Sequence, residues 1–135
     1  MKLFQFEVVT PERVFYTDEV EMISFQSQDG EIGIMANHEP MLIVNRVCVL
    51  KIKKDGTMKY AFISEGIIEV TAEKVRAIVD VAEWPDEIDV EEALKNKEFL
   101  EEQLKSEKED LEMRAELIAS IERAKGRINA VQKLT

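Results

Sequence analysis

Hydrophobic and polar residues alternate in the first part of the chain, in short stretches that turn residues separate. Residues 3–9 follow this pattern, with Phe4, Phe6 and Val8 on one side and Gln5 and Glu7 on the other. A period of two is typical of a half-buried strand. We therefore expect a strand here whose aromatic side chains face a core.

Similar short apolar stretches follow as far as residue 81, and turn residues end most of them. Asp55-Gly56 is a hairpin-turn pair, and Glu65-Gly66 predicts another turn. Short strands at even spacing indicate an antiparallel β-sandwich or flattened barrel of eight to ten strands. The expected strands begin at residue 14 and then cover 20–27, 42–53, 58–64, 67–71 and 75–81.

The pattern changes to a helical period after Trp84-Pro85. Pro85 cannot continue a central strand ladder, and Asp86 or Asp89 can cap a following helix. Apolar residues then recur at helical spacing over 89–106 and 110–131. The expected contact faces are Val90, Ala93, Leu94, Leu100 and Leu104, interrupted by Lys97, and Met113, Leu117, Ile121, Ala124, Ile128 and Val131.

Two one-sided helices in series predict an antiparallel helical hairpin. The joint at residues 106–110 holds no helix breaker, and its capping residues, Ser106 with Glu109 or Asp110 alone, could also continue the first helix. The break between the two helices is thus weakly encoded. The two segments could also form a single helix of roughly 65 Å, at about 1.5 Å per residue. We expect a β-sandwich domain over 1–84 and a helical hairpin domain over 85–135.

One segment, residues 29–42, is expected to turn, run as a short apolar strand and turn again. Asp29-Gly30 is a tight-turn pair, and Pro40 belongs in a turn or at a strand edge. Gly33 lies between two isoleucines, where a bare Cα allows a bulge or the close approach of another backbone. The segment displays polar side chains, among them Glu31 and His38.

Acidic residues outnumber basic ones by 28 to 18, which excludes a general nucleic-acid binder and a polybasic membrane anchor. No apolar run is long enough to span a bilayer, and the N-terminus has no signal-peptide pattern. The single cysteine, Cys48, lies in an apolar stretch. We expect it to be a buried, unreactive thiol, which fits a reducing cytoplasmic compartment.

The sequence offers little catalytic chemistry. His38 is the only histidine and no cysteine pair exists, so we expect no metal site. No nucleophile elbow or P-loop occurs, and the carboxylates of Asp29 and Glu31 near one turn are typical of solvated surface. We therefore expect no catalytic residue, and we expect His38 to bond a neighbouring backbone group or a partner.

The segment Gly30–Pro40 carries a family resemblance, because its spacing is G-x-x-G-I followed by H-x-P. Together with the opening LFQFEVVTPERVFY, the stretch SEGIIEV and the change to helix after Pro85, it makes the sequence resemble the epsilon chain of F-type ATP synthase. The resemblance covers essentially the whole chain in order. It implies contacts with the membrane c-ring and the gamma chain through Gly30, Glu31, Gly33, His38 and Pro40.

The resemblance also implies a regulatory ligand, because some bacterial epsilon chains bind ATP in the folded hairpin. Their motif on the first helix is Ile-Asp-x-x-Arg-Ala, but here Glu92 stands in place of its arginine and repels phosphate. The alternative for the arginines of the second helix is an ordinary surface ion pair with Glu116, Glu122 or the first helix. The residues that match the ATP-binding pattern are Glu83, Ile88, Asp89, Ala93, Arg123 and Arg127.

By this resemblance the chain is a non-catalytic rotor subunit on the cytoplasmic face of the bacterial cell membrane, peripheral and without lipid insertion. The sandwich would couple ion-driven rotation to the gamma chain. The hairpin would extend along gamma, reach the alpha and beta catalytic subunits and inhibit ATP hydrolysis, with no cofactor required. Two alternatives remain: a stand-alone ATP-binding sensor, and a β-sandwich adaptor with a coiled-coil tail. The sequence leaves the coupling ion, proton or sodium, open.

Overall fold

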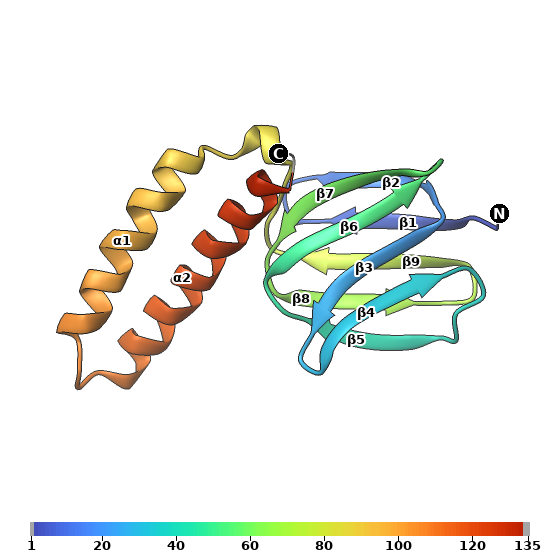
Figure 1. Cartoon of the computed structure of the whole chain (residues 1–135). Helices are drawn as coiled ribbons and strands as arrows, with labels where there is room; N and C mark the ends of the chain where they lie inside the picture. Colours follow the sequence, from blue (N-terminus) through green and yellow to red (C-terminus); the bar gives the residue numbers. More distant parts are fainter. Residues whose placement is uncertain (1, 134–135) are drawn as a thin grey trace.

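Ten short strands and two helices make up the computed structural model of the chain, which describes residues 2–133 (Figure 1). A single 3-10 turn, η1 (Pro85–Glu87), joins the sheet to the helices α1 (Val90–Ser106) and α2 (Leu111–Gln132). The strands are β1 (Phe4–Val9), β2 (Val14–Val20), β3 (Met22–Ser27), β4 (Gly30–Met35), β5 (Met41–Asn45), β6 (Cys48–Lys54), β7 (Thr57–Ile63), β8 (Gly66–Val70), β9 (Lys74–Val79) and β10 (Ala82–Glu83).

The strands form a nearly closed sandwich, in the order β10-β7-β6-β3-β5-β8-β9-β1-β2 with β4 paired to β3. A single pair, Ser27 with Asn45, links β3 to β5 where the sheet folds over. This confirms the predicted sandwich followed by two helices. Most neighbours are antiparallel, but β1 and β9 pair in parallel, which the local pattern did not predict.

The core lies between the two layers, and the period-two pattern places its residues there. Phe6 and Val8 of β1 are fully buried, as are Phe25 of β3 and Leu50 of β6. Cys48 is also buried, as expected, and burial raises the pKa of its thiol to about 11. The thiol is therefore protonated and unreactive at neutral pH.

The expected single strand over 42–53 is wrong, because the chain leaves one layer and enters the other at residues 46–47. β5 pairs with β8, whereas β6 pairs with β7 and β3. Asn45 is buried at this corner, and its Nδ2 donates to the backbone oxygens of Arg46 (3.1 Å) and Ser64 (3.0 Å). A buried amide bonded in this way fixes the corner and ends β5.

The close backbone approach that the sequence predicts at Gly33 occurs at Gly66 instead. Gly33 pairs in regular register with Ser24, and a Cβ on it would meet only the backbone oxygen of Ile23, at 3.9 Å. The expected bulge or close approach at Gly33 is therefore wrong. The close approach occurs at Gly66, where a Cβ would lie 2.2 Å from the backbone oxygen of Ile78.

The helices begin at two of the aspartates proposed as caps. The Asp89 side chain accepts from the Glu92 amide at 3.1 Å, and that of Asp110 accepts from the Met113 amide at 3.0 Å. The helices run side by side as the expected hairpin (Figure 1). Among residues 2–133, no helix is long and apolar enough to cross a membrane.

The contact faces of the helices differ from the prediction in three positions. Leu94 and Met113, expected in the seam, are 46% and 44% exposed. Lys97, expected to interrupt the α1 face, is partly buried, with its Nζ 3.2 Å from Glu101 Oε1. Lys97 lies one helical turn after the buried Ala93, so its apolar stem shares that side of α1.

Candidate functional site

Residues 29–42 form a strand with a turn at each end, as predicted. Gly30 has a φ of 117°, which opens β4, and Asn37 has a φ of 67° in the turn that follows it. Glu31 lies at the start of β4, and its Oε2 is 3.7 Å from Nζ of Lys51 in β6. His38 lies beyond its end, where Nδ1 is 3.0 Å from the backbone oxygen of Glu39.

The residues expected to form the contact segment therefore do not gather in one place. Gly30 and Glu31 lie at one end of β4 and His38 and Pro40 beyond the other, with Gly33 between them. Since a strand rises about 3.3 Å per residue, β4 alone separates the two ends by roughly 16 Å. The segment offers two polar contact points rather than one.

A row of apolar side chains crosses the outer face of the second layer. Val44, Ile67 and Ile78 are 54%, 39% and 41% exposed. They are direct neighbours, because Val44 pairs with Ile67 and Ile67 with Ile78. Leu42, on the same face of β5, is 67% exposed. An exposed apolar row of this kind is typical of a protein interface.

The link between sheet and helices is fixed to the sandwich by a guanidinium and a stacked aromatic pair. Arg13 Nη2 donates to Glu87 Oε1 at 2.9 Å, and that carboxylate also accepts from the Trp84 amide at 2.9 Å. Trp84 stacks on Phe15, with ring centres 4.4 Å apart. The Arg13 hydrogen bond, with that from Trp84, holds the pKa of Glu87 below its usual value. η1 therefore belongs physically to the sandwich.

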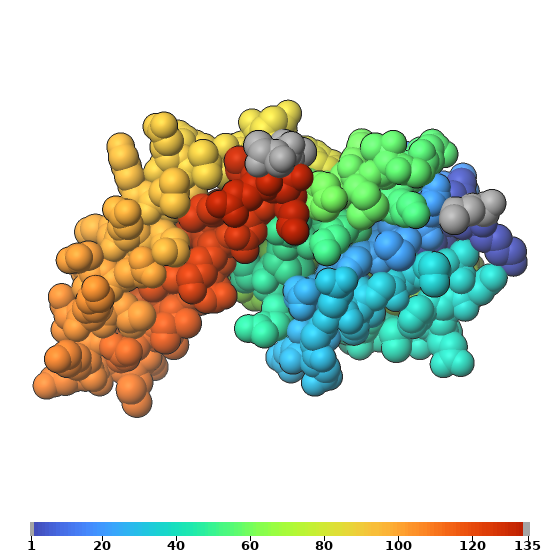
Figure 2. All heavy atoms as spheres, in the orientation of Figure 1, coloured from blue at the N-terminus to red at the C-terminus, as the bar shows by residue number. Residues whose placement is uncertain are grey.

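The hairpin packs on the sandwich through α2, against β6 and β7, while its tip projects away from the strands (Figure 2). Gly126 makes the close contact, because a Cβ there would lie 2.8 Å from Phe62 Cε1 and 3.1 Å from Val47 Cγ1. Ala130 nearby is fully buried. Small residues let the helix approach the fully buried Phe62 ring.

Two arginines of α2 reach carboxylates of the sandwich. Arg127 Nε lies 2.7 Å from Glu83 Oε1, and its guanidinium carbon lies 4.8 Å from the centre of the Phe62 ring. Arg123 Nη2 donates to Glu65 Oε1. Each of these four charged side chains is 28% to 47% exposed. Two ion pairs and the contact at Gly126 are thus among the interactions that join α2 to the sandwich.

The expected alternative partners for these arginines, Glu116 and Glu122, are wrong. Glu122 Oε1 lies 3.5 Å from Lys125 Nζ within α2. Arg123 and Arg127 face the sandwich instead. Glu65 lies in a turn far from α2 in sequence, so no local pattern could have identified it as a partner.

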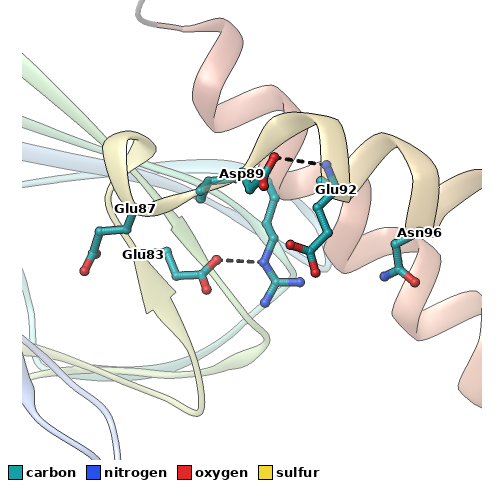
Figure 3. Close-up of a pocket in the computed structure, with 8 residues that line it drawn as sticks. Glu83, Glu87, Asp89, Glu92 and Asn96 are labelled. Carbon is teal, nitrogen blue, oxygen red and sulfur yellow. Dashed lines mark hydrogen bonds and ion pairs between the residues drawn. The ribbon is translucent and has the colours of Figure 1, made fainter.

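A hollow of about 360 Å³ lies between η1, α1 and α2. Figure 3 shows Glu83 of β10 and Glu92 and Asn96 of α1 pointing toward it. Five of the six residues proposed for ATP binding line it together, and the sixth, Arg123, does not. The lining residues are Glu83, Glu87, Ile88, Asp89, Glu92, Ala93, Asn96 and Arg127.

Comparison with known proteins decides the family. The family model of the ATP synthase delta/epsilon chain β-sandwich domain matches residues 3–85. An ATP synthase epsilon chain from Caldanaerobacter subterraneus subsp. tengcongensis is 41% identical over 133 residues, covering 98% of this chain and 96% of the relative. The chain belongs to the epsilon chain family of ATP synthase.

Solved structures share the fold of this epsilon chain. A chain of the Euglena gracilis mitochondrial ATP synthase, in an OSCP/F1/c-ring assembly, matches with a TM-score of 0.81 at 21% identity, covering 96% of this chain and 81% of that one. A chain of the Tetrahymena thermophila mitochondrial ATP synthase central stalk and c-ring matches with a TM-score of 0.64 at 13% identity, covering 96% and 97%.

The lining of the hollow is predominantly acidic. Four carboxylates line it, and Arg127 is the one basic side chain among its described lining residues. Arg127 is already paired with Glu83. Among residues 2–133, no group of three or more Asp, Glu, His or Cys side chains could hold a metal ion.

Proposed function

We propose that this epsilon chain is a non-catalytic rotor subunit of the central stalk. The sandwich transmits the rotation of an ion-driven c-ring to the gamma chain, and the hairpin restrains ATP hydrolysis. In this role the chain lies on the cytoplasmic face of the bacterial cell membrane, held there by protein contacts alone. The names of the solved structures that share this fold, an OSCP/F1/c-ring assembly and a central stalk with its c-ring, support a place in the central stalk.

The observation that carries the proposal is the way in which the hairpin is attached. α2 contacts the sandwich, whereas α1 packs on α2 and has few contacts with the strands (Figure 1). The attachment comprises the Gly126 contact and the pairs Arg123–Glu65 and Arg127–Glu83. Partly exposed ion pairs contribute about 0–1 kcal/mol each, and the burial of Phe62 under α2 adds to them, so a partner releases the hairpin when its differential affinity exceeds this sum.

Release of the hairpin has a direct chemical consequence. Arg123 and Arg127 leave Glu65 and Glu83 and become available to an acidic partner. Leu111 and Ile118, already 78% and 46% exposed, lie on the same helix and add apolar contact area. The extended α2 therefore suits acidic segments of the alpha and beta catalytic subunits, whose movement it would block.

The sandwich offers the contacts that coupling needs. The exposed row of Val44, Ile67 and Ile78 suits an apolar face of the gamma chain, as does Leu42 beside it. The polar points at Glu31 and His38, at opposite ends of β4, suit the loops of the c-ring and the adjacent part of gamma. Gly30, Gly33 and Pro40 shape the backbone between and around these two points.

The test of inhibition adds the purified chain to a catalytic head that lacks epsilon and measures ATP hydrolysis. One sample is the full chain and the other ends at Ile88, so that it keeps the Arg13–Glu87 hydrogen bond. We expect hydrolysis to be slow with the full chain and fast with the shortened one, although both bind the head. Equal hydrolysis rates would refute the inhibitory role.

A separate test addresses coupling through the apolar row. Ile67→Lys places a charge in the middle of that row, and we expect it to weaken binding to the gamma-containing head at least ten-fold. Thr57→Lys is the matched control, because it adds a lysine at an exposed position of β7, outside the row, and should bind like the native chain. If both variants bind as well as the native chain, this face is not the gamma contact.

A further inference from the structure

We propose that the hairpin of this chain excludes ATP, because Glu65 and Glu83 already pair with Arg123 and Arg127, the arginines that would otherwise attract a triphosphate. The inference deepens the proposed regulatory role of the hairpin. Its test uses the isolated chain, so it can fail while the inhibition assay succeeds, or the reverse.

The first argument is that both arginines already have carboxylate partners. Arg127 uses Nε for Glu83 at 2.7 Å, and its guanidinium lies over the Phe62 ring at 4.8 Å. Arg123 donates to Glu65. Both carboxylates belong to the sandwich, so the arginines join the two parts of the chain. A phosphate group that replaced these carboxylates would weaken the joint between the hairpin and the sandwich.

The second argument is the charge of the hollow itself. Glu92 points into it, and its lining includes the carboxylates of Glu83, Glu87 and Asp89 (Figure 3). The N-terminus of α1, an ordinary site for phosphate, is also occupied, because Asp89 accepts from the Glu92 amide. Each element that could attract a phosphate therefore already holds a carboxylate of this chain.

Ionic strength rather than nucleotide then sets the position of the hairpin. The paired side chains are 28% and 29% exposed for Arg127 and Glu83, and 31% and 47% exposed for Arg123 and Glu65. Salt screens pairs that are open to solvent to this degree. We expect the undocked fraction to rise with salt, and ATP to act only through the ions that it adds.

Gly126 provides a reporter for docking. It is the only glycine in α2, so its amide resonance is easily assigned, and the Phe62 ring beside it shifts that resonance in the docked state. The experiment titrates the isolated full chain with ATP and, in a parallel sample, with sodium sulfate at matched ionic strength. We expect the Gly126 resonance to move by the same amount in both. A saturable shift with ATP beyond the sulfate shift would overturn the proposal.

A double variant shows that charge is the cause and that the assay can detect binding. Glu83→Gln with Glu92→Arg removes two carboxylates from the hollow, adds a guanidinium and frees Arg127 from its partner. We expect this variant to give a saturable ATP-dependent shift, with at least ten-fold tighter binding than the native chain. Failure of the variant to bind ATP would overturn the claim that these carboxylates exclude the nucleotide.

Discussion

Arg114 of α2 donates a hydrogen bond of 3.0 Å from Nη1 to the backbone oxygen of Leu104 in α1. The same nitrogen donates to the backbone oxygen of Glu107, the residue that caps α1. The last carbonyl groups of a helix have no partner within the helix. A side chain of the second helix therefore closes the end of the first, and the turn between them is held more specifically than the sequence of residues 106–110 suggests.

Replacement of Arg114 tests this closure. Arg114→Leu keeps the bulk of the side chain but removes both hydrogen bonds, which we expect to cost the hairpin about 1 kcal/mol. Amide exchange should become several-fold faster in the last turn of α1 and remain unchanged in the strands. Lys125→Leu, in an exposed pair of the same helix, is the control. Equal exchange in the two variants would mean that Arg114 does not hold the turn.

The contact between Gly126 and Phe62 gives a second prediction. Ala has a helix propensity better than Gly by about 1 kcal/mol, but overpacking costs about 1–3 kcal/mol, and the Phe62 ring is fully buried. Gly126→Ala should therefore lift α2 from the sandwich while it strengthens the helix. Limited proteolysis of the hairpin should be faster than in the native chain. The control is Ser120→Ala at an exposed position of α2, and the prediction fails if the two variants are cleaved alike.

The sequence predicted those features that depend on neighbours along the chain. The alternation in residues 3–9 placed Phe6 and Val8 in the core, and Asp89 and Asp110 were among the proposed helix caps. Both kinds of signal act over a few residues. The division of residues 42–53 into two strands was missed, because a buried asparagine at a corner is not distinguishable from one in a strand.

Gly66 provides a third prediction, which concerns the sandwich alone. A Cβ there would lie 2.2 Å from the Ile78 backbone oxygen and 2.8 Å from Val79 Cγ1, and backbone cannot move aside cheaply. Gly66→Ala should lower the free energy of unfolding by about 3 kcal/mol or more in urea denaturation. Gly33→Ala is the matched control, because it meets only a contact at 3.9 Å and should change stability by less than about 1 kcal/mol.

The sequence patterns could not predict contacts between segments that are far apart in the chain. Arg123 and Arg127 were identified as functional residues, but their partners Glu65 and Glu83 became visible only when α2 was placed on the sandwich. The parallel pairing of β1 with β9 also joins segments that are far apart in sequence, so the local pattern did not predict it. Lys97 was expected to interrupt the contact face of α1, but it is partly buried, because a charged side chain with an apolar stem can occupy such a position.

The junction between sandwich and hairpin should depend on pH through Glu87. The hydrogen bond from Arg13, together with that from Trp84, lowers the pKa of this carboxyl below its ordinary value of 4.5. Because the pKa of Glu87 is lower in the folded than in the unfolded chain, its ionised carboxylate stabilises the junction at pH values above the unfolded pKa. This contribution is lost as the pH falls through the folded pKa. Below about pH 4.5, the protection of the Trp84 amide, measured as its exchange rate relative to the unfolded chain at the same pH, should therefore fall.

A substitution separates this group from the other carboxylates. Glu87→Gln removes the titrating group, so the pH dependence of Trp84 amide exchange should flatten in that variant. Glu12→Gln, at an exposed position beside Arg13, should keep the native dependence. If Glu87→Gln leaves the pH profile unchanged, another group controls the junction.

The central claim is that the hairpin inhibits only when it leaves the sandwich, and a reversible cross-link can hold it in place. Val49 of β6 and Asn129 of α2 line one hollow between sandwich and hairpin. Cysteines at these two positions, in a chain that also carries Cys48→Ala, can be joined by a short disulfide-containing linker. The single variant Val49→Cys, treated in the same way, controls for modification alone.

The decisive measurement is ATP hydrolysis by an epsilon-free catalytic head with this chain before cross-linking, after cross-linking and after reduction. We expect inhibition before, at least a several-fold loss of inhibition while the linker is in place, and its return on reduction. A cross-linked chain that inhibits as strongly as the open one would contradict the account, because the docked hairpin would then be the inhibitory state.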